Sequence, residues 1–85
     1  KFAVEENGIL AEINLNYNDF ENFKYCCRKS NVKIIDTEYL NNIRCKIEAT
    51  NEEKEELIRY VDKNEIKIVN FTILQNKKIR KNIEI

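Results

Sequence analysis

The feature that most constrains the fold is the strict alternation of apolar and charged residues at the end of the segment 34–49. Isoleucine, cysteine, isoleucine and alanine occupy every second position from 43 to 49, and Arg44, Lys46 and Glu48 lie between them. A period of two predicts a strand with one buried face. Residues 34–39 supply a partner strand across a turn at 40–42, so the segment is predicted to be a β-hairpin.

The register of this hairpin follows from matching apolar residues with apolar ones and acids with bases. The predicted pairs are Tyr39 with Ile43, Glu38 with Arg44, Thr37 with Cys45, Asp36 with Lys46, and Ile35 with Ile47. A slip of one residue would turn Asp36 and Glu38 into the core. We therefore expect Ile35, Thr37 and Tyr39 to point inward and Asn42 to adopt a left-handed conformation in the turn.

A strand and a helix are predicted before the hairpin. Residues 9–15 alternate as a strand, and Asn18 with Glu21 three positions later has the spacing of a helix N-cap and capping box. Phe20, Phe23 and Cys27 share one face of a helix that runs to about Lys29 and exits at residues 30–31, and this face is predicted to be core. Cys26 is expected to lie outside that core.

A second helix and a last strand follow the hairpin. Thr50 and Glu53 form another capping box, the acids at 52–56 suit the positive end of a helix dipole, and Asn64 can serve as a left-handed C-cap. The predicted buried side chains of this helix are Leu57, Ile58 and Val61. In residues 66–74 the alternation slips, which indicates either a bulge or a strand covered on both faces.

The element order is strand, helix, strand, strand, helix, strand. With right-handed crossovers this order predicts an α+β, ferredoxin-like βαββαβ sandwich, a four-stranded antiparallel sheet of order 4-1-3-2 with two helices on one face. We expect residues 9–74 to form this domain. Residues 1–8 are expected to be a linker or frayed strand following a missing N-terminal domain, and residues 75–85 a basic C-terminal tail.

Composition excludes several kinds of site. Fifteen basic and fifteen acidic residues give a formal net charge of zero, which removes a global electrostatic case for nucleic acid, and without histidine there is no histidine-based triad or metal ligand. A single glycine leaves no phosphate-binding loop, and three cysteines without paired spacing predict no disulfide framework. We expect a cytoplasmic chain with no catalytic residues, metal, cofactor or membrane segment.

One family resemblance can be stated from the residues. Leu15 and Tyr17 before the first helix, then Ile-Ile-Asp-Thr-Glu-Tyr at 34–39, three residues and an alternating strand from Ile43, resemble the C-terminal domain of unknown function of the IMPACT/YigZ family. The similarity runs from about Gly8 to Leu74. It implies an accessory domain, similar to modules of elongation factor G, in a protein linked to translation or RNA. Asn64 stands where the family often has glycine, and residues 75–85 extend beyond the family's usual end.

Two functions remain open at this stage. The first is a non-catalytic accessory domain that assists RNA, ribosome or other nucleic-acid binding. Its candidate phosphate contacts are Lys77, Lys78, Arg80, Lys81, Arg44 and Lys46. The second is a protein-interaction or dimerisation domain that uses the edge strand 32–39, with Val32 and Ile34 facing outward, or the open sheet face. Its partners would be the chain's own N-terminal domain or a second copy.

Overall fold

The computed structural model describes residues 2–83 and contains the six expected elements in the expected order. Their bounds are β1 Phe2–Leu15, α1 Tyr17–Ser30, β2 Lys33–Tyr39, β3 Ile43–Thr50, α2 Asn51–Lys63 and β4 Ile68–Ile83. The sheet is antiparallel with the order β2-β3-β1-β4, the predicted 4-1-3-2 read from its other end. The ferredoxin-like fold class is therefore confirmed.

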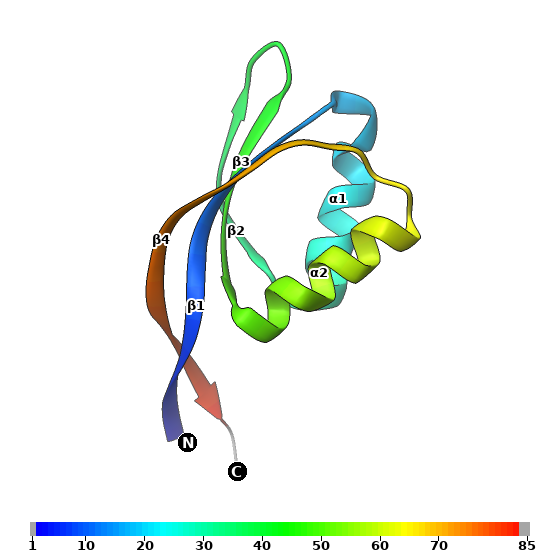
Figure 1. The fold of residues 1–85 in the computed structure, drawn as a ribbon. Helices are drawn as coiled ribbons and strands as arrows, with labels where there is room; N and C mark the ends of the chain where they lie inside the picture. Colours follow the sequence, from blue (N-terminus) through cyan, green and yellow to red (C-terminus); the bar gives the residue numbers. More distant parts are fainter. Residues whose placement is uncertain (1, 84–85) are drawn as a thin grey trace.

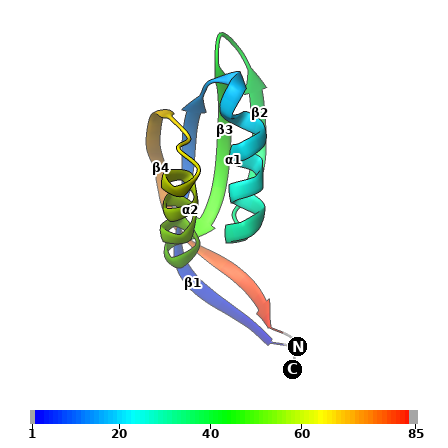
Figure 2. The same cartoon turned by 90° about the vertical axis from the view of Figure 1, so that its right-hand side faces the viewer.

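Both helices lie on one face of the sheet (Figures 1 and 2). No helix of residues 2–83 lies on the opposite face, and β2 and β4 are the two edges of the sheet. β1 and β4 also continue together past the end of α2 as a two-stranded ribbon, which Figure 1 shows below the helices. The molecule thus has a two-layer body and a ribbon that extends from it.

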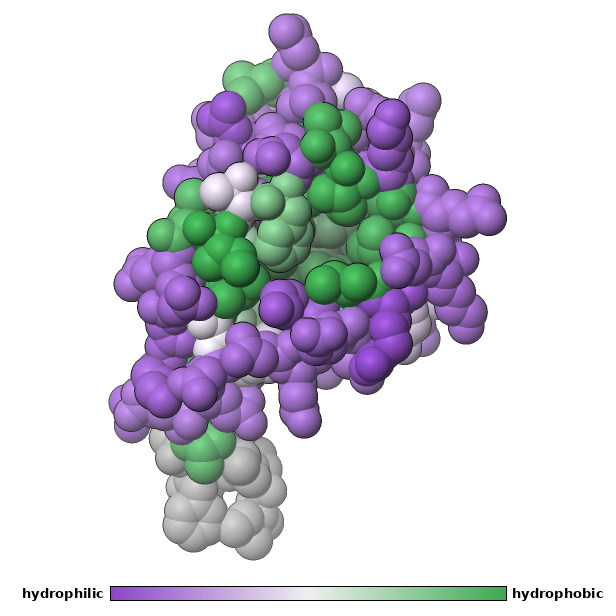
Figure 3. Space-filling view, in the orientation of Figure 1, coloured by the Kyte–Doolittle hydropathy of each residue, from purple (hydrophilic) through white to green (hydrophobic). Residues whose placement is uncertain are grey.

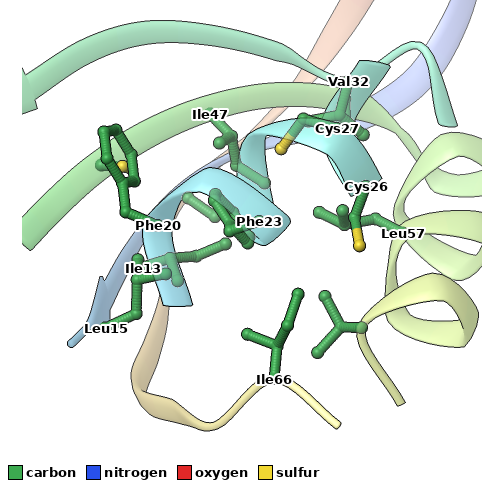
Figure 4. Packing of buried hydrophobic residues seen from close by; sticks show 14 of the residues in the cluster. Ile13, Leu15, Phe20, Phe23, Cys26, Cys27, Val32, Ile47, Leu57 and Ile66 are labelled. Atoms are coloured by element: carbon green, nitrogen blue, oxygen red, sulfur yellow. The ribbon is translucent and has the colours of Figure 1, made fainter. Parts of the chain in front are cut away.

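The core fills the space between the helices and the sheet (Figure 4). Phe23 of α1 is fully buried at its centre, against inward residues of β1 and β3 such as Ile13 and Ile47. Burial of such side chains is the main stabilising term of a small domain, at about 1.5–3 kcal/mol each. The predicted core face of α1, with Phe20, Phe23 and Cys27, is confirmed.

The hairpin register is confirmed for four of its predicted pairs, from Tyr39 opposite Ile43 to Asp36 opposite Lys46. The fifth pair is wrong, because the register shifts between Ile34 and Asp36 and places Ile34 opposite Ile47. This bulge turns Ile35 outward, where it is 42% exposed, and gives Ile34 the half-buried inner position. Tyr39 contacts Phe20 edge-on but is 66% exposed, because it lies beside the turn at the tip of the hairpin.

The helix ends and the hairpin turn differ from prediction at three asparagines. α1 begins at Tyr17 with Asn16 as its N-cap, so the capping role predicted for Asn18 is wrong. Positive φ occurs at Asn31, the C-cap of α1, and at Glu65, and at no other non-glycine residue between Phe2 and Ile83. The left-handed conformations predicted for Asn42 and Asn64 are therefore wrong, and Glu65 makes the reversal after α2 instead. The Thr50–Glu53 capping box is confirmed in both directions.

The buried faces of the helices also differ at two positions. Cys26 is fully buried, because α1 packs against α2 as well as against the sheet and Cys26 faces Leu57 across that contact (Figure 4). Ile58 was expected in the core but is 43% exposed, while Leu57 and Val61 are buried as predicted. The exposed Ile58 lies on the side of α2 that faces β4.

The outer strands are longer than predicted. β1 begins at Phe2 rather than near residue 9, and β4 runs to Ile83 rather than ending at Leu74, so residues 75–83 are strand and not a separate tail. Register shifts leave Leu74 and Val69 as extra residues on β4, which confirms the bulge alternative for this strand and contradicts the one in which both faces are covered.

Candidate functional site

Three of the four basic residues of β4 are engaged with acidic or amide side chains of the same domain. Lys77 Nζ lies 2.7 Å from Glu48 Oε2, and Lys81 Nζ lies 2.6 Å from Glu53 Oε2. Lys78 Nζ donates a hydrogen bond of 2.6 Å to Asn7 Oδ1. Because two of the four charges are paired with carboxylates, the segment is far less cationic than its sequence indicates.

Arg44 and Lys46 lie on the open face of the sheet, on β3. Arg44 is within 3.4 Å of Glu38 and 3.8 Å of Glu12, and its Nε is buried without a hydrogen-bond acceptor. Both residues alternate with acids across the strands, since Lys46 pairs in register with Asp36 and Glu12. Positive and negative side chains alternate on this face, so it does not join Arg44 and Lys46 to the basic residues of β4 in one basic patch.

A polar hollow of about 480 Å³ lies beside Lys77 and Lys78. Its other lining residues are Asn7, Gly8, Asn51 and Asn76. Amides and two lysines form a surface suited to an anion, although the acidic first turn of α2, with Glu52 and Glu53, begins directly after Asn51. This hollow is the part of the predicted basic site that retains the chemistry of a phosphate contact.

The three cysteines are buried free thiols and are unsuited to nucleophilic chemistry. Burial, with nearby Cys45 and Cys26 adding smaller effects, raises the pKa of Cys27 to about 12. Burial also raises the pKa of Cys26 and of Cys45. A thiol is reactive as the thiolate, so these side chains act as core residues rather than as nucleophiles.

The edge strand β2 is a weaker docking surface than its sequence indicates. Val32 and Ile34 were expected to face outward, but Val32 is 6% exposed and Ile34 packs against the core. Lys33, Asp36 and Glu38 are exposed along the strand, and the bulge near Ile35 interrupts its regular edge. Charges and bulges of this kind are the usual protection of an edge strand.

The other edge strand, β4, carries the main apolar surface, which the sequence analysis did not identify. Val69, Phe71, Ile73 and Leu74 are each between 37% and 49% exposed. Phe71 and Ile73 pair in register with the buried Ile13 and Ala11, so they lie on the helix side of the sheet where no helix covers them. The available signal was the absence of any charged residue from Ile68 to Asn76. We call Ile68–Asn76 the neutral segment of β4.

A groove lies between the neutral segment and α2. Its volume is about 200 Å³, and Ile13, Phe23, Leu57, Ile58, Val61, Asp62, Ile68 and Phe71 line it. Asp62 is the one charged residue among them, and the floor reaches core side chains such as Phe23. Figure 3 shows apolar surface gathered around a hollow in the middle of this side of the molecule. Phe71 both lines the groove and belongs to the exposed apolar side chains of β4, so the two features adjoin.

Within the part of the chain that the structure describes, no group of three or more histidine, cysteine, aspartate or glutamate side chains is arranged to hold a metal ion. Neither α1 nor α2 is both long enough and apolar enough to cross a lipid bilayer.

The fold and these surfaces define a ferredoxin-like α+β domain with one open polar sheet face and one apolar edge. Residues 13–63 match the family model described as Domain of unknown function (DUF1949), and the match covers more than half of the chain. The chain belongs to this family. No curated protein and no solved structure gave a significant match. Because the family match ends at residue 63, β4 lies outside it.

Proposed function

We propose that this domain is a non-catalytic protein-interaction module that binds its partner along β4 and the adjoining groove. The observation that carries the proposal is the exposure of Val69, Phe71, Ile73 and Leu74 on one strand, next to an apolar groove. Contiguous apolar surface on a small domain is costly in water, and it usually marks a binding site.

The resemblance to the IMPACT/YigZ family supports an extension of this proposal. In that family the corresponding domain is an accessory part of a longer protein linked to translation or RNA. The domain would then use β4 to hold a further domain of its own chain or another component of the same assembly. A second copy of the chain is a competing occupant that the experiments below distinguish.

Nucleic-acid binding is a second candidate, supported by the hollow beside Lys77 and Lys78. Two observations weigh against it as the main function. Lys77 and Lys81 are already paired with Glu48 and Glu53, and the open face is of mixed charge rather than basic. A nucleic-acid contact would have to displace these carboxylates, which reduces the gain from each phosphate.

Affinity capture from cells of the source organism separates the two candidates. The tagged chain would be compared with an Ile73→Lys variant, with a Leu40→Lys control in the hairpin turn, and with a Lys78→Gln/Arg80→Gln variant. Leu40 is a matched control because it is 48% exposed, against 47% for Ile73. The glutamine variant leaves both ion pairs of Lys77 and Lys81 intact.

We expect proteins to be recovered with the wild type and with Leu40→Lys and to be lost with Ile73→Lys. The opposite result would be RNA that is recovered with the wild type and with Ile73→Lys but not with Lys78→Gln/Arg80→Gln. That result would contradict the interaction proposal and favour nucleic-acid binding. Circular dichroism of each variant shows whether the fold is retained.

A further inference from the structure

The two edges of the sheet differ in how well they are closed to another strand. β2 carries the exposed charges Lys33, Asp36 and Glu38 and a bulge, whereas β4 has no charge from Ile68 to Asn76. A strand at the end of a sheet leaves half of its backbone N–H and C=O groups without strand partners. The bulges at Val69 and Leu74 bound a regular stretch of β4 between them. The edge open to strand addition is therefore this short stretch.

The volume of the groove beside that stretch limits the size of the group that the groove can hold. A volume of about 200 Å³ lies below the range of about 300–1,000 Å³ that is usual for small-molecule and cofactor sites. It suits one large apolar side chain. Since Phe71 lines the groove and belongs to the regular stretch, a side chain from a strand added beside β4 would lie next to it.

The charges at the two ends of the neutral segment indicate what should flank such a strand. Lys67 precedes the segment and Lys78 follows it, and both are exposed, whereas Lys77 is paired with Glu48. Acidic residues at either end of a bound strand would be favoured there. A second copy of this chain that paired through its own β4 could not supply them, because β4 contains no acidic residue from Ile68 to Ile83.

We infer that β4 is extended by a fifth strand from a partner protein. This strand is a short extended segment with acidic flanks that places one large apolar side chain in the groove between β4 and α2. The inference rests on the proposed function and names the chemistry of its partner. Main-chain hydrogen bonds would give affinity, and the groove and the flanking lysines would give selectivity.

The test uses a phage-displayed library of random twelve-residue peptides, selected against the immobilised 85-residue chain. Enriched peptides would be synthesised and their dissociation constants measured by fluorescence polarisation. We expect sequences with alternating apolar residues and acidic ends. Ile73→Lys should weaken their binding by about tenfold or more, as expected for a central apolar contact. Lys67→Glu should weaken it by about threefold, as expected for an exposed ion pair.

Two matched controls lie far from β4. Leu40→Lys places the same substitution on the hairpin turn, and Lys33→Glu reverses an exposed lysine on the opposite edge strand. Both should stay within about twofold of the wild type, as is usual for surface changes away from a binding site. If Leu40→Lys weakens binding and Ile73→Lys does not, the inference fails, while a protein-interaction function at another surface survives.

Peptide N-methylation tests the strand itself. In an added strand alternate amides point toward β4, so methylation of one alternate set should abolish binding while methylation of the other set is tolerated. Equal tolerance of both sets would overturn strand addition. So would a library that yields no peptide enriched over an unrelated control protein, or a dimer of the chain in sedimentation that Ile73→Lys dissociates. After any of these outcomes, the affinity-capture experiment would remain a separate test of the proposed function.

Discussion

Single residues in this domain show how close packing limits sequence choice. Gly8 is the one glycine of the chain, and its φ is not positive, so its backbone could accommodate alanine. The reason for glycine is contact, because an added Cβ atom would overlap the Ala49 carbonyl oxygen and the end of the Ile79 side chain. The Ile79 side chain, which packs over Gly8, is only 7% exposed. Glycine therefore lets β1, β3 and β4 approach one another where the ribbon leaves the body.

The Gly8→Ala variant should lower the free energy of unfolding by about 1–3 kcal/mol, the usual cost of overpacking. The sign is informative, because alanine at an unstrained site would instead stabilise by about 0.4–1 kcal/mol through the unfolded chain. Urea denaturation followed by circular dichroism measures the change. Adding Ile79→Val removes one of the overlapping atoms and should recover part of the loss. A stabilised Gly8→Ala variant would contradict this account.

The buried thiol of Cys27 makes stability depend on alkaline pH. Its pKa is raised by burial to about 12 in the folded state, from an ordinary value of 9.0. Above pH 9 the unfolded chain loses this proton while the folded chain keeps it, so stability falls as pH rises through this range. The contribution is fully present below pH 9, and the slope is about 1.4 kcal/mol per pH unit for one thiol.

Urea denaturation of the wild type and of Cys27→Ala between pH 8 and pH 10 checks this prediction. The variant should be less stable at pH 8 because it leaves a cavity, and its stability should fall less steeply with pH. Cys26 and Cys45 are present in both proteins, so the difference between the slopes belongs to Cys27. Parallel slopes would show that this thiol ionises equally in both states.

At the scale of elements, agreement with the sequence was best where two independent patterns coincided. The hairpin register was predictable because apolar pairing and charge pairing selected the same alignment, as Glu38 opposite Arg44 shows. The resemblance-bearing Tyr17 also has a structural role, since its hydroxyl donates a 2.5 Å hydrogen bond to the Leu40 carbonyl and joins α1 to the hairpin turn. The bulge at Ile35 was not predictable, because either Ile34 or Ile35 satisfies the inward apolar position.

Helix caps give a matched comparison between the two helices. Thr50 accepts a hydrogen bond of 3.1 Å from the Glu53 backbone N–H, whereas the Asn16 side chain makes no capping hydrogen bond to α1. Thr50→Val keeps the buried shape and removes the acceptor, so it should destabilise the protein by about 1 kcal/mol.

The matched control, Asn16→Ala, should change stability by less than about 0.5 kcal/mol, as expected for a surface change that removes no bond. Thermal and urea unfolding of both variants gives the comparison. Equal losses of stability from the two substitutions would show that the hydrogen bond of the Thr50 hydroxyl contributes little to stability.

At the scale of the whole molecule, the surfaces were less predictable than the fold. The basic residues at 77–81 read as an isolated cationic cluster in the sequence, but long-range pairing brings Glu48 and Glu53 to Lys77 and Lys81. Residues 66–74 were predicted to be a strand with a bulge or with both faces covered, and neither alternative included an exposed apolar surface. Only the position of α2, which leaves the inner side of β4 uncovered, makes Phe71 and Ile73 exposed. Both differences arise from contacts between elements that local patterns do not contain.

If β4 is a binding edge, its exposed side chains should be dispensable for folding. Val69→Lys and Ile73→Lys, at positions 49% and 47% exposed, should each change the free energy of unfolding by no more than about 0.5 kcal/mol, as for ordinary surface sites. The contrasting variant Phe23→Ala, at a fully buried residue, should cost about 3–5 kcal/mol. Urea denaturation at fixed protein concentration gives all three values.

The same series separates binding from folding as the reason for an apolar β4. A large loss of stability in Val69→Lys or Ile73→Lys would mean that these side chains support the fold, and a loss of partner binding in those variants would then carry no information about a site. Unchanged stability together with lost binding assigns their exposed surface to the partner.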